Sequence, residues 1–139
     1  MKGLLKEFEA RGIEVIFAPL PYCSGALCFK QGRWFCVIAS QKPLTHQRFT
    51  LAHELYHFDH HQKMGNFFLD YSQSGWMERE ANRGAAEYLM PDFLVPVAME
   101  ALKSQGNLSL EELARFFGVS RQAMRIRLEE LGFWPLQGL

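Results

Sequence analysis

The sequence lacks long hydrophobic runs, an excess of either charge and paired cysteine motifs, and each absence excludes a class of protein. No apolar stretch near the N-terminus is long enough for a signal peptide or a membrane span, so we expect a cytoplasmic protein. Fifteen basic residues balance fifteen acidic residues, which excludes a global field that would attract nucleic acid. The three cysteines lack CxxC spacing, so no cysteine-based zinc or redox site is expected.

The composition is that of a folded protein. Hydrophobic residues make up 48% of the 139 residues and aromatic residues 14%, which is enough for a packed core. The length fits one compact domain with a small appendage. We place the main domain at residues 1–105 and the appendage at residues 106–139, and we expect the two to pack on the same core.

The first forty residues predict a helix followed by a small antiparallel sheet. Residues 2–11 carry apolar side chains at helical spacing, and Gly12 lies where a C-terminal glycine ends a helix. Three runs of β-branched and aromatic residues follow, at 13–18, 26–30 and 33–39. The last two flank Gln31-Gly32, which is typical of a tight hairpin turn. We therefore expect a three-stranded antiparallel sheet in an α+β fold.

Helical patterns dominate after Pro43. Residues 44–60 have apolar side chains at the spacing of a buried helix, and residues 77–90 are rich in Ala and Glu and stop at Pro91. The intervening residues 65–75 are expected to form a loop or a short strand.

Three shorter helices are expected after Pro91. Residues that favour helix N-caps mark their starts: Asp92, Ser109 and Ser120. Pro96 is tolerated in the first turn of the first of these helices. Glycine-containing positions mark the ends: Gly106-Asn107, Gly118 and Gly132.

The segment 53–57, HELYH, is the first pattern with chemical meaning. On a helix, His53 and His57 lie at positions i and i+4 on one face, and the carboxylate of Glu54 lies beside them. This is the ligand arrangement of HExxH zinc hydrolases.

A hydrolytic zinc site needs three protein ligands and an open position for water, so HELYH alone is incomplete. A histidine six residues after His57 is excluded, because position 63 is Lys63. The other common arrangement is a glutamate on a following helix, with Asp or Asn four residues later to support a ligand histidine. Glu78 and Asn82 supply this spacing, whereas Glu80 points about 200° away from Glu78. We interpret Glu78 as the third ligand. The alternative is that the histidines are buried helix residues and the glutamate is a solvated charge.

Two longer segments resemble a known family. Residues 48–57, RFTLAHELYH, resemble the RFTLAHELGH signature of the ImmA/IrrE metallopeptidases, and residues 78–91 resemble their second signature, ExEANxFAAxLLMP. Two positions differ: Tyr56 stands where the family usually has glycine, and Gly84 where it usually has an aromatic residue. We expect the Tyr56 ring to fill the space that Gly84 leaves.

The resemblance implies a zincin-like, helical core with two histidines and one glutamate on zinc, as in thermolysin-type peptidases. In this interpretation His53, His57 and Glu78 bind Zn²⁺, although the same ligands also accept Mn²⁺ or Fe²⁺. Glu54 acts as the general base, and Asn82 orients a ligand imidazole. Several family members act on helix-turn-helix repressors, so the implied substrate is a repressor of this kind.

Peptide hydrolysis also needs a donor to the oxyanion besides the metal. Four side chains near the motifs are candidates that spacing cannot separate: Tyr56, His60, His61 and Tyr88. His60 and His61 fit equally well as solvated residues at a helix end. His46, seven residues before His53, could share its face but is expected to be a surface residue.

Residues 113–124 follow a helix-turn-helix pattern, with a small Ala, a turn Gly and apolar residues at core spacing. A role in DNA or partner binding would use the polar residues of the second helix: Arg121, Gln122, Arg125 and Arg127. Residues 107–139 contain four Arg and four Glu, which is not the basic patch that phosphate binding requires. DNA binding is therefore possible but disfavoured, and a helical hairpin that completes the fold or docks a substrate is preferred.

The sequence thus leaves two functions. The favoured function is a zinc-dependent endopeptidase of narrow specificity that cleaves a regulatory repressor. The alternative is a transcription-regulatory DNA- or protein-binding module whose metal site is structural or degenerate. The intact Glu54 favours the enzyme, because a structural metal site has no need of a base beside it.

Overall fold

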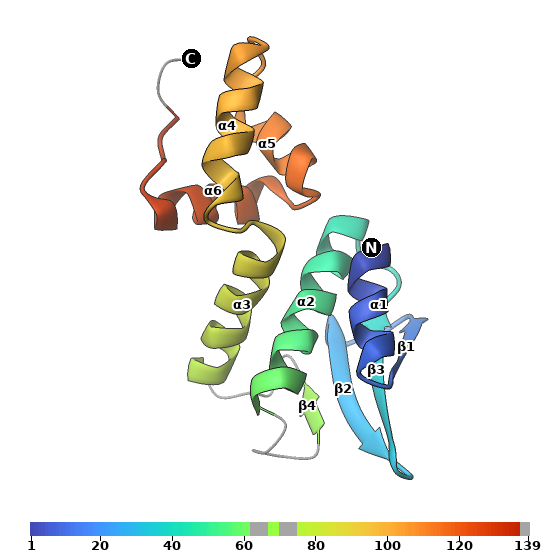
Figure 1. The fold of residues 1–139 in the computed structure, drawn as a ribbon. Coiled ribbons are helices and arrows are strands. Elements are labelled where there is room, and N and C mark those ends of the chain that lie inside the picture. Colours follow the sequence, from blue (N-terminus) through green and yellow to red (C-terminus); the bar gives the residue numbers. More distant parts are fainter. Residues whose placement is uncertain (62–66, 70–74, 137–139) are drawn as a thin grey trace. The chain divides into compact units, whose positions relative to one another are not determined.

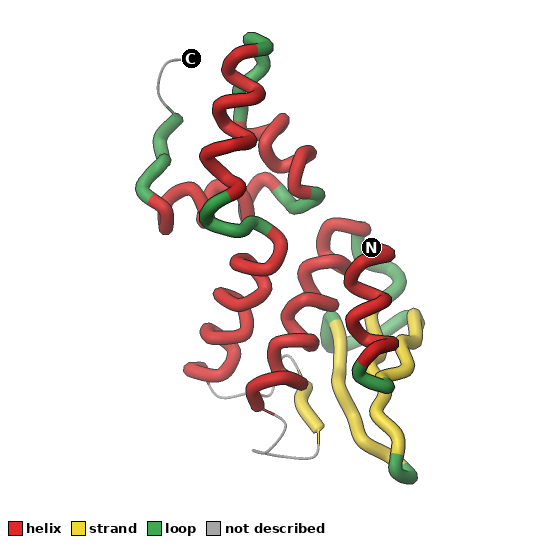
Figure 2. The backbone as a smooth tube through the Cα atoms, viewed as in Figure 1, coloured by secondary structure: helices red, strands yellow, loops and turns green. Residues whose placement is uncertain are grey.

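The computed structural model describes residues 1–61, 67–69 and 75–136 and has an α+β fold. The contacts divide the chain into two compact units, Met1–Ala85 and Ala86–Leu139. The described strands all belong to the first unit, and the described elements of the second unit are helices (Figures 1 and 2). The predicted domain boundary near residue 105 stays a prediction.

The sheet of the first unit has four strands in the order β1-β3-β2-β4. The strands are β1 (Ile13–Ala18), β2 (Gly25–Lys30), β3 (Arg33–Ala39) and β4 (Phe67–Leu69). β2 and β3 form the predicted antiparallel hairpin, and its turn residues Gln31 and Gly32 both have positive φ, 53° and 74°, as a two-residue hairpin turn requires.

The prediction of a three-stranded antiparallel sheet is wrong in two respects. β1 pairs with β3 in parallel, with Ile13 opposite Trp34, because the hairpin places β3 rather than β2 beside β1. In addition, β4 adds an antiparallel fourth strand next to β2. It lies within the segment expected to be a loop or short strand, and the rest of that segment up to residue 74 lies outside the described residues.

Two helices pack against this sheet and build the core of the first unit. α1 (Lys2–Ala10) contacts β1, and α2 (Leu44–His61) contacts β2 and β3 (Figure 1). α1 ends as predicted, at Arg11 followed by Gly12 with a φ of 72°. Completely buried apolar residues come from the two helices and from the sheet, among them Phe8, Leu27, Cys36, Ile38 and Leu51.

The residue pair that departs from the family signatures lies where α2 meets α3 (Gly75–Leu89). A Cβ atom added to Gly84 would overlap three ring atoms of Tyr56, of which the most distant, Cγ, would be 2.8 Å away. The Tyr56 ring therefore occupies the space that a larger residue at position 84 would need, as expected from the two departures together.

The second unit contains α4 (Leu94–Ser104), α5 (Leu110–Phe117) and α6 (Arg121–Leu131). The predicted caps of the last two helices are present, since the hydroxyls of Ser109 and Ser120 accept hydrogen bonds from backbone N–H groups three residues later, both at 3.1 Å. Gly118 and Gly132 end these helices in the left-handed conformation. Buried apolar side chains hold the three helices together: Val95, Ala98, Leu113, Met124 and Leu128.

The predicted cap at Asp92 is wrong. α4 begins at Leu94 after Phe93, and no side chain caps it. The carbonyl of Pro91 instead accepts hydrogen bonds from the backbone N–H groups of Leu94 and Val95, at 3.0 and 3.1 Å. A backbone turn thus satisfies donors that a side-chain cap would otherwise satisfy. Across the described ranges, none of the helices combines the length and the apolar character that crossing a bilayer requires.

Candidate metal centre

The site is built on the buried face of α2, which is unusual in its polarity. His53 and His57 are 4% and 0% exposed, and Glu54 between them is also completely buried. Burying polar side chains costs free energy unless they find polar partners. The stability of this face of α2 therefore depends on the polar groups that these residues contact.

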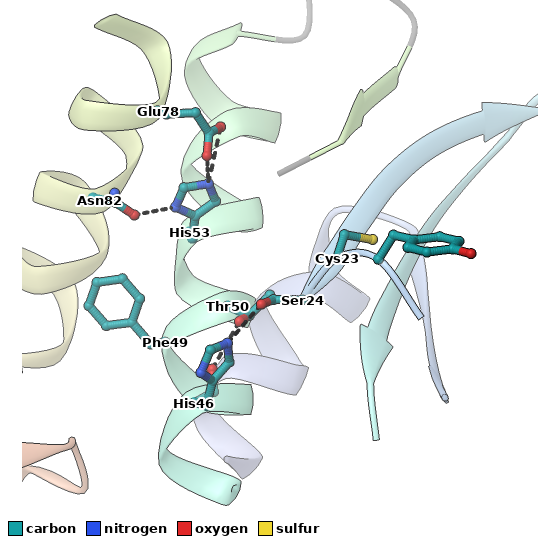
Figure 3. Close-up of a pocket in the computed structure, with 9 residues that line it drawn as sticks. Cys23, Ser24, His46, Phe49, Thr50, His53, Glu78 and Asn82 are labelled. Carbon is teal, nitrogen blue, oxygen red and sulfur yellow. Dashed lines mark hydrogen bonds and ion pairs between the residues drawn. The ribbon is translucent and has the colours of Figure 1, made fainter. Parts of the chain in front are cut away.

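Glu78 reaches the two histidines from the first turn of α3. One carboxylate oxygen lies 2.7 Å from Nε2 of His57 and the other 3.1 Å from Nε2 of His53, while the two Nε2 atoms are 3.1 Å apart (Figure 3 draws His53 and Glu78). Ligand atoms around a tetrahedral zinc with bonds near 2.1 Å are separated by roughly 3.4 Å. The three side chains thus form a donor set of the right chemistry and nearly the right spacing for a divalent metal ion.

The electrostatics of the cluster favour the protonation states that bind metal. Burial raises the pKa of Glu78, but hydrogen bonds and charge interactions with His53 and His57 outweigh it and hold the pKa at about 2. Burial lowers the pKa of His57, and the neighbouring His53 and His61 add to this effect against the hydrogen bond with Glu78. A carboxylate and a neutral imidazole are the forms that donate electrons to a cation.

The remaining ring nitrogen of each histidine has its own contact. Nδ1 of His53 lies 2.8 Å from Oδ1 of Asn82, one turn after Glu78 on α3, which is the contact that the spacing predicts (Figure 3). Nδ1 of His57 lies 2.8 Å from Nδ1 of His61, whose Nε2 lies 2.7 Å from a carboxylate oxygen of Glu80.

The burial of His61 excludes one of the two roles expected for it. It is 1% exposed, so it is not a solvated residue at the helix end. Sequence reasoning also missed the partner role of Glu80, which it considered only as a metal ligand. A signal was present, because His57 and His61 have the same i and i+4 spacing as the two HExxH histidines.

A pocket of about 390 Å³ opens beside the cluster. Its wall is formed by His53, Glu78 and Asn82 on one side, and by residues before and at the start of α2 on the other (Figure 3). Here Oγ of Ser24 lies 2.8 Å from Nε2 of His46. His46 is exposed, as expected, but it faces the pocket together with Tyr22. No motif in the sequence marks the segment that carries Tyr22 and Ser24.

The four candidate oxyanion donors are not among the described residues of the pocket wall. The Tyr56 ring stacks on His60, with centroids 3.9 Å apart and planes 16° apart, and it packs on Gly84. His61 contacts His57 and Glu80. Tyr88 is 46% exposed and belongs to the second unit.

The polar residues of α6 have different environments. Arg121 and Arg125 are exposed and lie near acidic residues, Arg121 at 2.9 Å from Glu111 and Arg125 at 3.9 Å from Glu129. Gln122 is also exposed. Arg127, which was also expected to be available for DNA or partner contacts, is instead buried.

Arg127 is 6% exposed, and its Nε donates a hydrogen bond of 2.9 Å to the carbonyl of Met90. That carbonyl directly follows the last residue of α3, where unsatisfied carbonyls carry partial negative charge. Arg127 therefore caps a helix end inside the second unit and is not available to bind a partner.

A comparison with protein families matches residues 8–129 to the peptidase M78 family, described as an IrrE N-terminal-like domain. The match covers most of the chain, including all residues of the metal cluster and its outer contacts. No curated protein matches the chain in a separate comparison. At the family level the match supports a hydrolase of the metallopeptidase class. The two signatures, the His-His-Glu cluster and this match agree, and the chain belongs to the peptidase M78 family.

Proposed function

We propose that the protein is a zinc-dependent endopeptidase of narrow specificity. The observation that carries the proposal is the cluster of His53, His57 and Glu78, with Glu54 next to His53 in α2. Two members of the cluster, His53 and Glu78, line a pocket. Two imidazoles and one carboxylate are a common ligand set of catalytic zinc in peptidases, and they leave a coordination position for water.

The residues divide the reaction between them. A bound Zn²⁺ supplies Lewis acidity, which polarises a carbonyl and lowers the pKa of water. Glu54 takes a proton from the attacking water while the water oxygen forms a bond to the carbonyl carbon. Glu54 then delivers that proton to the amide nitrogen as the C–N bond breaks. Asn82 holds the His53 ring through Nδ1.

The proposed substrate is a regulatory helix-turn-helix repressor, whose cleavage would relieve repression of transcription. This step rests on the resemblance to ImmA/IrrE peptidases. The pocket supports a peptide substrate, because it combines apolar and polar side chains, such as Phe49, Ser24 and His46, on the same wall.

The test is the variant Glu54→Gln, which removes the base and keeps the shape of the side chain. We expect zinc content to stay at the wild-type level and cleavage of a helix-turn-helix repressor substrate to fall by about 10²–10⁴-fold. Metal analysis and a timed cleavage assay measure both quantities. His57→Ala serves as the contrasting variant, because it should lose metal and activity together. Wild-type cleavage rates in Glu54→Gln would refute the mechanism.

The alternative function is a DNA- or protein-binding regulator with a structural metal site. The exposed Arg121 and Arg125 on α6 are the features that favour it. A gel-shift titration across salt concentrations tests it, because phosphate contacts give binding that weakens steeply with salt. We expect no specific shift, since both arginines have acidic neighbours.

A further inference from the structure

The two histidines of the metal cluster differ in what holds their outer nitrogen. His53 contacts the neutral amide of Asn82, whereas His57 contacts a second imidazole, that of His61, which in turn contacts the Glu80 carboxylate. The side chain of His61 is 2% exposed and that of Glu80 is 44% exposed. A chain of hydrogen bonds therefore runs from the buried cluster to a solvated charge.

We propose that His61 and Glu80 are positioning residues that hold His57 in its metal-binding tautomer. This inference rests on the proposed metal site. Nε2 of His57 can bind a cation only if it carries no hydrogen, so the single hydrogen of the neutral ring must be on Nδ1. That hydrogen points to Nδ1 of His61 at 2.8 Å. Nδ1 of His61 must then accept.

The donor and acceptor roles along this chain of hydrogen bonds follow from its last member, Glu80. If Nδ1 of His61 accepts, the hydrogen of the neutral His61 ring is on Nε2, which lies 2.7 Å from Oε1 of Glu80. An ionised carboxylate can only accept hydrogen bonds. Glu80 thus favours the tautomer of His61 that accepts from His57, and His61 favours the tautomer of His57 that leaves Nε2 open to metal.

The His61 ring also contacts two aromatic rings. The ring centroids of Tyr56 and Trp76 lie 5.6 and 5.7 Å from its own, at interplanar angles of 61° and 86°. Edge contacts of this kind restrict the rotation of a buried ring. The orientation of His61 is therefore fixed by packing as well as by hydrogen bonds, as a group that orients a ligand requires.

The experiment measures metal affinity rather than activity. Zn²⁺ is titrated against a chromophoric chelator in the full chain for the wild type and four variants. His61→Phe keeps an aromatic ring and removes both nitrogens, so we expect zinc affinity to fall about 10–100-fold. His61→Asn places an acceptor where Nδ1 was, and should recover most of this loss although it cannot reach Glu80. The zinc affinity of Glu80→Ala should lie between those of these two variants. Glu87→Ala, an exposed glutamate on the same helix, is the matched control and should bind like the wild type.

A spectroscopic readout separates positioning from simple packing. In ¹⁵N-labelled, zinc-loaded wild type we expect a slowly exchanging Nδ1–H signal from His57, which is lost in His61→Phe and kept in His61→Asn. Equal zinc affinity in the wild type, His61→Phe and Glu80→Ala would overturn the positioning role while leaving the proposed function intact. Absence of zinc binding by the wild type would overturn the metallopeptidase proposal itself. If His61→Phe does not fold, the Asn and Glu80 variants decide the matter alone.

Discussion

α2 and α6 both carry the polar motifs of this sequence, yet they place their polar side chains in opposite environments. α2 buries the polar residues His53, Glu54, His57 and His61. α6 exposes Arg121, Gln122 and Arg125, and buries only Arg127 among its polar residues. Burial of several ionisable groups on one helix face has a large cost in free energy, whereas exposed charges have almost none.

The two helices differ in whether their polar residues form a site. On α2, His53 and His57 lie close to each other and to Glu78, and His61 contacts His57, so the free-energy cost of burying these three histidines is incurred at one site. On α6, the exposed Arg121 lies near an acidic side chain and contributes to solubility. The buried Arg127 donates a hydrogen bond to a backbone carbonyl and caps a helix end. We therefore expect changes of polar residues to be tolerated poorly on α2 and well on α6, with Arg127 as the exception.

The largest effect on stability is expected at the contact of α2 with α3. Gly84→Phe restores the aromatic residue usual in the family but places it where the Tyr56 ring lies. We expect the free energy of unfolding to fall by about 3 kcal/mol, or the protein not to fold, because overpacking forces strained rotamers and backbone shifts. The double variant Tyr56→Gly with Gly84→Phe should recover most of the loss in urea unfolding. Failure of the double variant to recover would show that the two positions are not coupled.

Arg127 should be the most sensitive polar position of α6. Arg127→Met keeps the length of the side chain and removes the donor to the Met90 carbonyl. We expect a loss of about 1–3 kcal/mol, because a buried carbonyl is left without its charged partner. Thermal unfolding measures it. A loss no greater than that of an exposed arginine variant would contradict the capping role.

The pH dependence of the metal-free protein should report the buried groups of α2 and their partner Glu78. The pKa of His57 is lowered from 6.5, so the unfolded chain takes up a proton first and stability falls as pH drops below about 6.5. The pKa of Glu78 is lowered from 4.5 to about 2, so its contribution is present above 4.5 and is lost between 4.5 and 2. Each group contributes a slope of at most about 1.4 kcal/mol per pH unit. Urea unfolding with a chelator from pH 8 to 3 measures both windows, and His57→Gln should remove the upper one.

The smallest effect is expected for the exposed arginines of α6. Arg121→Ala and Arg125→Ala should each change the free energy of unfolding by less than about 0.5 kcal/mol, because exposed ion pairs contribute little. The same urea titration serves for both. A loss above 1 kcal/mol would mean that α6 depends on its surface charges and would weaken the contrast with α2.

Local patterns predicted the helices and the metal cluster because both depend on spacing along one element. HELYH and the Glu78/Asn82 pair needed only the helical period to be placed on the faces that meet. The β2–β3 turn was predicted from Gln31-Gly32 between two strand-like runs, and both residues adopt the positive φ that such a turn needs.

Contacts between distant segments were not predictable in the same way. The parallel pairing of β1 with β3 depends on strand order, which alternation of apolar residues does not encode. The Glu80 contact with His61 depends on how far a long side chain reaches across two helices. The start of α4 was misplaced because a backbone carbonyl, that of Pro91, took the role of the expected Asp92 side chain.

The contact between Tyr56 and Gly84 also constrains the order in which the two positions could have changed from the usual family pair. If tyrosine had replaced glycine at position 56 first, two aromatic rings would have competed for one space. If glycine had arisen at position 84 first, the intermediate would have carried a cavity between α2 and α3, a defect that folded proteins often survive. The order in which glycine first arose at position 84, giving an intermediate with glycine at both positions, is therefore the more favourable one. Gly84 lies on the same helix as Glu78, α3. Filling that cavity with Tyr56 would therefore also have restored the packing of α3 that places Glu78 beside the histidines.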